Sequence, residues 1–267
     1  MPGQFNTGYG PAAVVTGAAR GIGAGFTSAL GDRGFDLLLT DVDEAALQRT
    51  SEKLEVRTGR QVRRVALDMR EPGAPAELEQ FAQASDVGLV VCNHLFPGGE
   101  LRGLDTDLAQ LNQAIDANVR AYVEVAHRFG RHLRDRTSGG LIPMSSMTAA
   151  VGSPYVTAYG ASKAFVLAFG SGLSYELRSS GVDVLTLVPS SVNTETYRRA
   201  TQSPSRVFPP MEVDVLVQQG LARLGKRWVA VPGARNLLTA AILTRLLPRR
   251  TAISLMGRSM ETMLKTR

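Results

Sequence analysis

The chain alternates between short apolar runs and longer segments that have the periodicity of an amphipathic helix. Residues 35–40 form a near-continuous apolar run, which is typical of a parallel strand buried on both faces. Runs of this kind predict strands over residues 12–15, 35–40, 62–67, 87–91, 141–145, 182–188 and 228–231. Between them, the pattern predicts helices over residues 24–30, 43–59, 75–84, 105–134 and 157–179.

This order of elements predicts one α/β domain over residues 1–267, built on a doubly wound, mostly parallel sheet of seven strands with helices on both faces. Residues 1–10 are expected to form a flexible N-terminal arm, and residues 232–267 an apolar and basic C-terminal tail of the same domain. Ligands of such sheets bind at the carboxyl ends of the strands. The candidate groups at these ends are a glycine-rich turn, Asp41, Asp68, Asn93, Ser146 and Pro189.

Tyr159 and Lys163 lie four residues apart in the segment YGASK, so a helix places both side chains on one face. A cation beside a phenol favours the phenolate, and we expect it to lower the pKa of Tyr159 toward neutrality. Such a tyrosine can donate or accept a proton, and the nearby Ser146 hydroxyl can hydrogen-bond a carbonyl or alcohol oxygen. Alone, a tyrosine and lysine at this spacing are more often ordinary surface residues.

A glycine-rich segment near the N-terminus changes that assessment. The sequence TGAARGIG, residues 16–23, follows a predicted strand and precedes a predicted helix. A turn of this kind lets the backbone approach a pyrophosphate, and the helix N-terminus supplies N–H donors. Its glycines, Gly17, Gly21 and Gly23, are spaced more widely than in the common dinucleotide fingerprint.

Together with the downstream serine, tyrosine and lysine, this glycine spacing resembles the short-chain dehydrogenase/reductase family over about residues 10–200. The resemblance implies that Ser146, Tyr159 and Lys163 are catalytic and that Asn118 completes a tetrad through a water linked to the lysine. It also implies a set of cofactor contacts: Gly17, Arg20, Gly21, Ile22, Gly23, Asp41, Asp68, Met69, Asn93, Tyr159, Lys163, Pro189, Val192 and Thr194. The chain departs from the family pattern at two places, because only Asn93 remains of the family's NNAG segment and Ser190 replaces a glycine.

Asp41 ends the second predicted strand, where a carboxylate can accept hydrogen bonds from the ribose hydroxyls of NAD and repel the 2′-phosphate of NADP. Its alternative role is to cap the next helix, for which Asp43 is better placed. Arg20 favours NADP, because a basic residue before Gly21 can reach a 2′-phosphate, but Val42 supplies no second cation. We therefore expect NAD, with NADP less favoured.

The substrate region is largely apolar and has no evident clamp for an anion. The resemblance places Met147, Tyr155 and Tyr197 at the pocket, with residues 197–211 forming a mobile loop over it. Such a lining suits a small lipid-like, steroid-like or aromatic ketone or alcohol, although members of the family commonly have apolar pockets. The alternative is a nucleotide-binding sensor without catalysis, but a sensor has no need of the complete proton-transfer group.

Charge and cysteine usage narrow the function classes further. The formal charge of +6 comes from dispersed arginines, which favours a solvated surface over nucleic-acid binding. The single cysteine, Cys92, is expected to be a buried thiol, which fits a cytoplasmic protein, and residues 1–11 do not resemble a signal peptide. The three histidines show no metal-binding spacing, so no metal is expected.

The C-terminal tail and two helices suggest further contacts. Residues 237–264 are apolar and basic but too short and interrupted to span a bilayer. A lid over the substrate or a subunit contact is expected there ahead of peripheral membrane binding. The helices over residues 105–134 and 157–179 carry apolar residues on more than one face, which predicts a homodimer or homotetramer.

Overall fold

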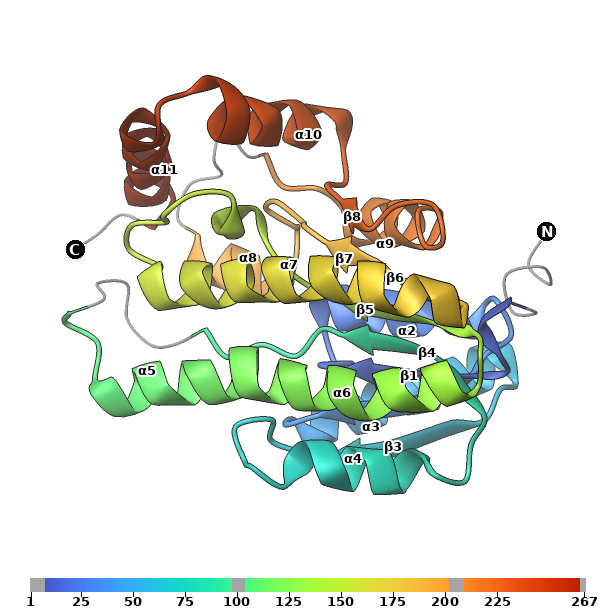
Figure 1. Ribbon diagram of the computed structural model, residues 1–267. Coiled ribbons are helices and arrows are strands. Elements are labelled where there is room, and N and C mark those ends of the chain that lie inside the picture. The colour runs from blue at the N-terminus through green and yellow to red at the C-terminus, as the bar shows by residue number, and fades with distance from the viewer. Residues whose placement is uncertain (1–7, 98–103, 202–208, 265–267) are drawn as a thin grey trace.

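The computed structural model describes residues 8–97, 104–201 and 209–264 (Figure 1). Its centre is a parallel six-stranded sheet with the order β3-β2-β1-β4-β5-β6. The strands are β1 (Ala12–Thr16), β2 (Asp36–Asp41), β3 (Val62–Ala66), β4 (Val87–Cys92), β5 (Gly139–Pro143) and β6 (Val182–Val184). The chain order reverses between β1 and β4, so a crevice for ligands is expected where these two strands end. The doubly wound parallel fold predicted from the sequence is therefore confirmed.

Helices cover both faces of this sheet. The longer ones are α2 (Gly21–Gly31), α3 (Glu44–Thr58), α4 (Ala74–Ala82), α5 (Leu108–Ile115), α6 (Ala121–Asp135), α7 (Thr157–Leu177) and α9 (Val213–Leu221). Side chains of α2, α3 and α9 share one apolar core with the sheet, and those of α4, α6 and α7 share the other. The second layer, with α7 above α6 and α6 above α4, faces the viewer in Figure 1.

The strand count differs from the predicted seven. The predicted strand over residues 182–188 divides into β6 and β7 (Thr186–Leu187), and β7 pairs with β8 (Val229–Ala230) in a separate two-stranded sheet. Hydrogen bonds still connect the interrupted edge to β5, because Leu185 donates to the Leu141 carbonyl and Ser145 donates to that of Leu187. The break at residue 185 redirects the chain toward β8 without detaching it from the main sheet.

Residues 8–10, the described part of the expected N-terminal arm, lie against the sheet. Tyr9 packs against the core of the α2 and α9 layer, and its hydroxyl donates a 2.8 Å hydrogen bond to Asp183. The backbone oxygen of Tyr9 would lie only 1.8 Å from a Cβ at Gly88. A glycine on β4 therefore lets residues 8–10 lie directly against the sheet, whereas residues 1–7 are outside the described part.

The C-terminal tail folds into helices that stand above the sheet (Figure 1). These are α10 (Ala234–Ala241), a π-helical turn (Ile242–Leu246) and α11 (Arg249–Leu264). They bury a third apolar cluster in which Leu243, Ala252, Met256 and Met260 pack on Met147. Within the described residues, no helix is both long and apolar enough to cross a membrane.

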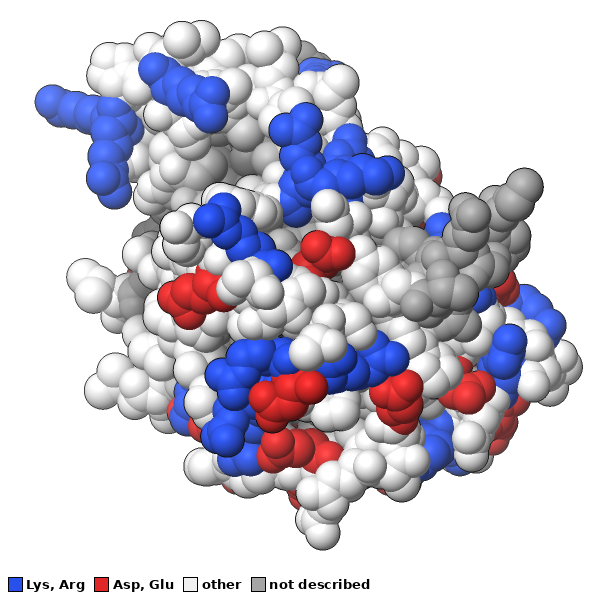
Figure 2. All heavy atoms as spheres, turned by 45° about the vertical axis from the view of Figure 1, so that its right-hand side comes forward, with Lys and Arg blue, Asp and Glu red and all other residues white. Residues whose placement is uncertain are grey.

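Surface charge is mixed over much of the molecule. In the view of Figure 2, acidic and basic side chains lie among one another across the lower half. The segment of residues 233–260 contains five arginines and no acidic residue. The arginines that give the chain its formal charge of +6 are thus balanced locally in the sheet domain and unbalanced in the tail.

Candidate active site

The glycine-rich turn lies between β1 and α2 and requires its glycines for distinct reasons. Gly17 and Gly21 have φ of +62° and +54°, a left-handed backbone that favours glycine. A Cβ at Gly23 would lie 1.8 Å from the Gly17 carbonyl oxygen, so only glycine permits this approach of helix to turn. Arg20 precedes α2 without capping it through its side chain, and the first turn of α2 has no acidic residue. The helix N-terminus can therefore receive an anion.

Thr16 ties this turn to the end of β4. Its hydroxyl accepts hydrogen bonds from the backbone N–H groups of Asn93 (2.9 Å) and His94 (3.1 Å), and it lies 2.7 Å from His94 Nδ1. The Asn93 amide donates to the Gly17 carbonyl at 3.0 Å. Asn93 thus holds the turn in shape, and these contacts connect the two neighbouring strand ends.

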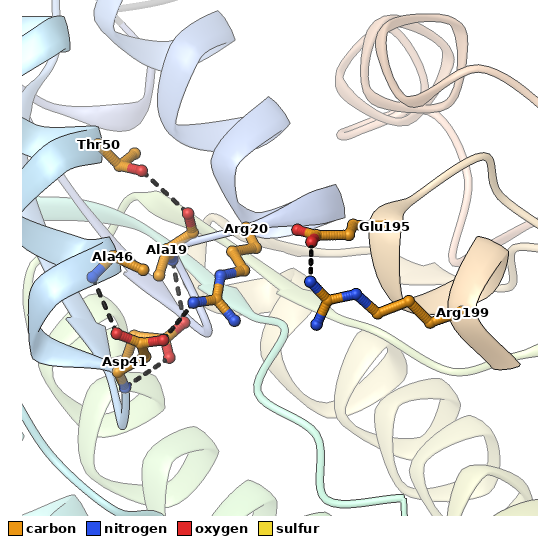
Figure 3. Close-up of polar contacts among 8 residues, drawn as sticks. Ala19, Arg20, Asp41, Ala46, Thr50, Glu195 and Arg199 are labelled. Atoms are coloured by element: carbon orange, nitrogen blue, oxygen red, sulfur yellow. Dashed lines mark hydrogen bonds and ion pairs between the residues drawn. The ribbon is translucent and has the colours of Figure 1, made fainter.

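Asp41 lies at the end of β2, beside the turn. One of its carboxylate oxygens accepts from Ala19 N at 2.9 Å and the other from Asp43 N at 3.1 Å. Asp43, and not Asp41, caps α3, as the sequence indicated, because its side chain accepts from Ala46 N. In Figure 3 the Arg20 side chain points toward the end of β2 at Asp41 and away from the Glu195–Arg199 ion pair of the helix α8 (Glu195–Ala200). Arg20 forms an ion pair with Asp43.

A cavity of about 250 Å³ opens beside Asp41 at the carboxyl ends of the strands. Its lining includes Gly17, Asp41, Asp68, Met69 and Leu95. Its size and place suit a nucleoside, and the predicted contacts Asp41, Asp68 and Met69 meet there. Ile22, on the first turn of α2, packs instead on the core of that helix layer.

Asp68 does not face this cavity as an isolated carboxylate. Arg70 forms a short ion pair with it and donates a backbone hydrogen bond to it at 2.9 Å. The Arg70 side chain hydrogen bond is the main reason why the pKa of Asp68 lies below its ordinary value. The Arg70 guanidinium also lies over the Phe96 ring, 5.1 Å from its centroid, so the pair forms one wall of the cavity.

Ser146, Tyr159 and Lys163 come together where β5 ends and α7 begins. Ser146 follows β5, and α7 carries Tyr159 and Lys163 one turn apart on the face toward the sheet. The Lys163 ammonium lies 5.9 Å from the centroid of the Tyr159 ring. It donates to the Met144 carbonyl at 2.9 Å and to the Tyr122 hydroxyl at 3.1 Å. The arrangement predicted from the sequence is present, but Tyr122 was not identified as a site residue.

The electrostatics of this group differ from the sequence expectation. Burial raises the pKa of Tyr159, although hydrogen bonding with Ser146 opposes the shift. Burial lowers the pKa of Lys163 to about 7, because the site disfavours the charged ammonium form. The expected lowering of the Tyr159 pKa by Lys163 therefore does not appear in the protein alone.

Asn118 lies in a π-helical turn, Asp116–Arg120, between α5 and α6. Such turns are frequent at functional sites. The Asn118 amide accepts from Phe96 N at 2.9 Å and donates to the Phe96 carbonyl at 2.6 Å. The side chain therefore braces the loop after β4, and its role in a proton relay stays a prediction.

The segment after β7 closes the site from the other side. The Pro189 carbonyl accepts from Met147 N at 2.8 Å, and Val192 pairs with Met211 in an isolated bridge. Thr194 caps α8 through a 3.1 Å bond to Tyr197 N, and its methyl group would lie 3.1 Å from a Cβ at Gly21. This segment therefore meets the glycine-rich turn directly.

The predicted substrate residues lie in two places. Met147 and Tyr155 join the apolar cluster of the tail, and the Tyr155 hydroxyl forms a short hydrogen bond with Glu261 of α11. Tyr155 has φ of +67°, a strained conformation for a tyrosine. Tyr197 lies in α8, so a helix occupies the start of the predicted mobile loop, and residues 202–208 of that loop are outside the described part.

Among the described residues, no three histidine, cysteine, aspartate or glutamate side chains are grouped as a metal site. Cys92 is a buried free thiol, as expected, and burial raises its pKa to about 12. His94 is buried against the Tyr122 ring, and burial lowers its pKa to about 3. Both groups are therefore neutral near pH 7.

Comparisons with known proteins find a matching family model, similar sequences and similar structures. A family model described as short chain dehydrogenase matches residues 11–205. The 7beta-hydroxysteroid dehydrogenase of Clostridium sardiniense is 27% identical over 237 residues, which cover 87% of this chain and 89% of that protein.

Two solved structures show the same fold. One, from work on the stereoselectivity of 7beta-hydroxysteroid dehydrogenase, has a TM-score of 0.88 at 22% identity and covers 94% of this chain and 98% of that one. A short-chain dehydrogenase from Sphingobium yanoikuyae in complex with NADPH has a TM-score of 0.74 at 26% identity and covers 83% and 87%. The coverage of the first is high enough that the match must reach into the C-terminal tail.

Proposed function

Because the chain belongs to the short-chain dehydrogenase family, we propose that it interconverts a secondary alcohol and a ketone, with Tyr159 as general acid and base. Family membership makes it an NAD(P)-dependent oxidoreductase. The observation that carries the proposal is the convergence of Ser146, Tyr159 and Lys163 at the carboxyl ends of the strands, beside the glycine-rich turn. This is a complete proton-transfer group next to a nucleotide site, which argues against the alternative of a sensor without catalysis.

The residues present fit a dinucleotide. The cavity of about 250 Å³ beside Asp41 has room for a nucleoside, and the N-terminus of α2 has no acidic residue to repel a pyrophosphate. Gly17, Gly21 and Gly23 would admit the pyrophosphate, and Val192 and Thr194 would flank the nicotinamide end. When bound, the cofactor supplies or accepts the hydride.

The chain's own residues then position the substrate and move the proton. The Ser146 hydroxyl orients the substrate oxygen, and the Tyr159 hydroxyl gives a proton to the ketone oxygen or takes one from the alcohol. Lys163 favours the Tyr159 phenolate when it carries its charge, and Asn118 holds the loop that borders the site. The backbone between Met147 and Pro189 fixes the relative position of the two site segments.

We assign NAD as the preferred cofactor on the surroundings of Asp41. Its carboxylate faces the cavity, and each of its oxygens accepts one backbone hydrogen bond, which leaves lone pairs for ribose hydroxyls. Arg20, the cation that would favour a 2′-phosphate, is paired with Asp43. The complex with NADPH described above belongs to a relative and bears on that protein.

Replacing Asp41 with alanine is expected to weaken NAD binding about tenfold or more and to strengthen NADP binding. The change removes both the acceptor for the ribose hydroxyls and the charge that repels a 2′-phosphate. Fluorescence titration of both cofactors into the wild type and the variant measures this. Asp36→Ala, at the opposite end of β2, is the matched control. Tighter binding of NADP than of NAD to the wild type would mean that Arg20 leaves Asp43 and decides the preference.

We propose an apolar substrate because the loop after Ser146 and the C-terminal tail meet in an apolar cluster. Met147, Val151 and Tyr155 of the loop after Ser146 pack with the tail in one apolar cluster. The tail thus belongs to the site-forming unit, and lipid-like, steroid-like or aromatic alcohols match its chemistry. The named activity of the relative from Clostridium sardiniense, on a hydroxysteroid, supports this class.

A homodimer or homotetramer is proposed from apolar side chains that one chain leaves exposed on α5 and α7. Ile115 is 53% exposed and Phe165 38% exposed, although Ala114, Tyr122 and Val125 of the same helical stretch are buried within the chain. Light scattering is expected to show a dimer or tetramer, and Phe165→Glu is expected to dissociate it because the charge would be buried unpaired. Val56→Glu, at a 90% exposed position of α3, is the control that should keep the assembly. A monodisperse wild-type monomer would refute the proposal.

A screen of secondary alcohols and ketones with each cofactor, followed by absorbance of the reduced nicotinamide, tests the function. Steroid and aromatic substrates are expected to react, and short polar alcohols are expected to react far more slowly. Cofactor binding without turnover on any member of the panel would favour the sensor.

A further inference from the structure

Tyr122 of α6 lies at the centre of the buried polar group beneath the site. It is 1% exposed, and its hydroxyl donates to the His94 carbonyl at 3.0 Å. The same oxygen accepts from Lys163 Nζ at 3.1 Å. Its ring centroid lies 4.6 Å from Lys163 Nζ and 4.3 Å from the centroid of the His94 imidazole. The phenol therefore contacts Lys163 through both its oxygen and its ring.

These contacts fix Lys163 more closely than those with Tyr159 do. The ammonium lies nearer the Tyr122 ring than the Tyr159 ring, whose centroid is 5.9 Å away. The second acceptor of Lys163 is the Met144 carbonyl at 2.9 Å. The Tyr122 phenol and the Met144 carbonyl thus both accept hydrogen bonds from the Lys163 ammonium.

We propose that Tyr122 is a positioning residue that holds Lys163 beside Tyr159 and governs how much positive charge Lys163 presents to it. The proposal rests on the function proposed above, because Tyr122 acts on the reaction only through Lys163. The direction of its hydrogen bonds carries the argument. The Tyr122 hydroxyl lies 3.0 Å from the His94 carbonyl and 3.4 Å from the Met144 carbonyl. A backbone carbonyl can only accept, so the Tyr122 proton goes to a carbonyl and the phenol oxygen is left as an acceptor for Lys163.

The other groups that face Lys163 leave it sensitive to this contact. They are Cys92 on β4, His94 after β4, Tyr122 on α6 and Tyr159 on its own helix. Burial keeps all four neutral near pH 7, because it raises the pKa of the thiol and of both phenols and lowers the pKa of the imidazole. No fixed anion among them stabilises the ammonium against the effect of burial, so its hydrogen bonds to Tyr122 and Met144 are the contacts that favour its charged form.

The first test follows Lys163 in the protein without cofactor. The chain has four lysines, Lys53, Lys163, Lys226 and Lys265, so ¹³Cε-lysine labelling gives four NMR signals. Lys163→Arg assigns the signal of interest by its loss. In the wild type it is expected to titrate near pH 7, since burial lowers its pKa to about 7. In Tyr122→Phe the midpoint is expected to fall by about one unit, because the ammonium loses a hydrogen bond.

The second test measures the pH dependence of alcohol oxidation. The rate is expected to rise with pH as Tyr159 ionises. In Tyr122→Phe the fraction of Lys163 that carries its charge above pH 7 falls about tenfold, so the phenolate is favoured less. Turnover on this limb should therefore be about tenfold lower, with no change at pH values where Lys163 is charged in both proteins. In a Lys163→Met background, Tyr122→Phe should have no further effect, since the two residues act as one unit.

Tyr175→Phe is the matched control, because Tyr175 is 58% exposed on α7 and lies outside the site. It should leave the signal, the pH limb and turnover unchanged. If Tyr122→Phe does not fold, 2,3-difluorotyrosine at position 122 keeps the shape and weakens the acceptor. It should lower the Lys163 midpoint and the turnover on the limb by less than Tyr122→Phe would.

An unchanged Lys163 midpoint and pH limb would overturn the proposal, as would a loss of turnover that is uniform in pH and additive with Lys163→Met, since either shows a packing role. If the wild type turns over no substrate, the proposed function fails while the NMR titration still decides the Tyr122–Lys163 contact.

Discussion

Tyr159→Phe is expected to lower turnover by about 10² to 10⁴ while leaving cofactor affinity within about twofold of the wild type. General acid–base catalysis is typically worth this factor, and the change removes the proton donor and little else. The Tyr159 hydroxyl is hydrogen-bonded with Ser146, so the change also removes that hydrogen bond. The packing of the buried residues of α7 is left unchanged. Steady-state rates with a reactive alcohol and cofactor titrations measure the two effects separately.

Tyr197→Phe is the appropriate comparison, since it removes a phenolic hydroxyl from α8 and leaves the Tyr159–Lys163 pair intact. We expect it to change KM more than kcat. Near-normal turnover in Tyr159→Phe would exclude Tyr159 as the acid and base and leave the proton transfer without its proposed donor.

Gly23→Ala is expected to abolish cofactor binding at concentrations that saturate the wild type and to destabilise the fold. The new Cβ would lie 1.8 Å from the Gly17 carbonyl oxygen and 2.7 Å from the Asn93 amide nitrogen. Both neighbours shape the turn, and Asn93 is also bonded to Gly17, so no flexible side chain can relieve the clash. Cofactor titration and thermal unfolding would both report the change.

Gly73→Ala, just before α4, controls for the added methyl group. A Cβ there meets nothing within 4 Å, and Gly73 has ordinary helical backbone angles, so stability should be unchanged or slightly higher. Wild-type cofactor affinity in Gly23→Ala would mean that the turn adapts and that the glycine spacing is not what admits the pyrophosphate.

Much of the architecture could be predicted because its signals are local. The apolar runs of β1, β2 and β4 are buried along their whole length or nearly so, and parallel strands buried on both faces need such runs. The spacing of Tyr159 and Lys163 is also a local signal, because residues four apart on a helix lie on one face. The boundary at residue 185 was missed, because an apolar run does not show where a strand changes its partner.

The electrostatic environment of the site was not predictable in the same way. A lysine four residues from a tyrosine suggested a lowered phenol pKa, yet burial raises the pKa of Tyr159 and lowers that of Lys163. Burial depends on α6, β4 and the loop at His94, which are distant in sequence. Arg20 and Asp43 likewise pair across 23 residues, so the state of the cation that bears on cofactor choice was not visible in the motif.

The sequence by itself determined the fold class and the glycine-rich turn, because these follow from periodicity and backbone freedom at short range. Side-chain chemistry at short range predicted the residues of the proton-transfer group. Only the tertiary structure decided that Tyr9 packs on the sheet, that the tail joins the loop at Tyr155 and that Tyr122 holds Lys163. Each of these depends on segments brought together by the sheet, and buried contacts between distant segments leave no periodic trace in the chain.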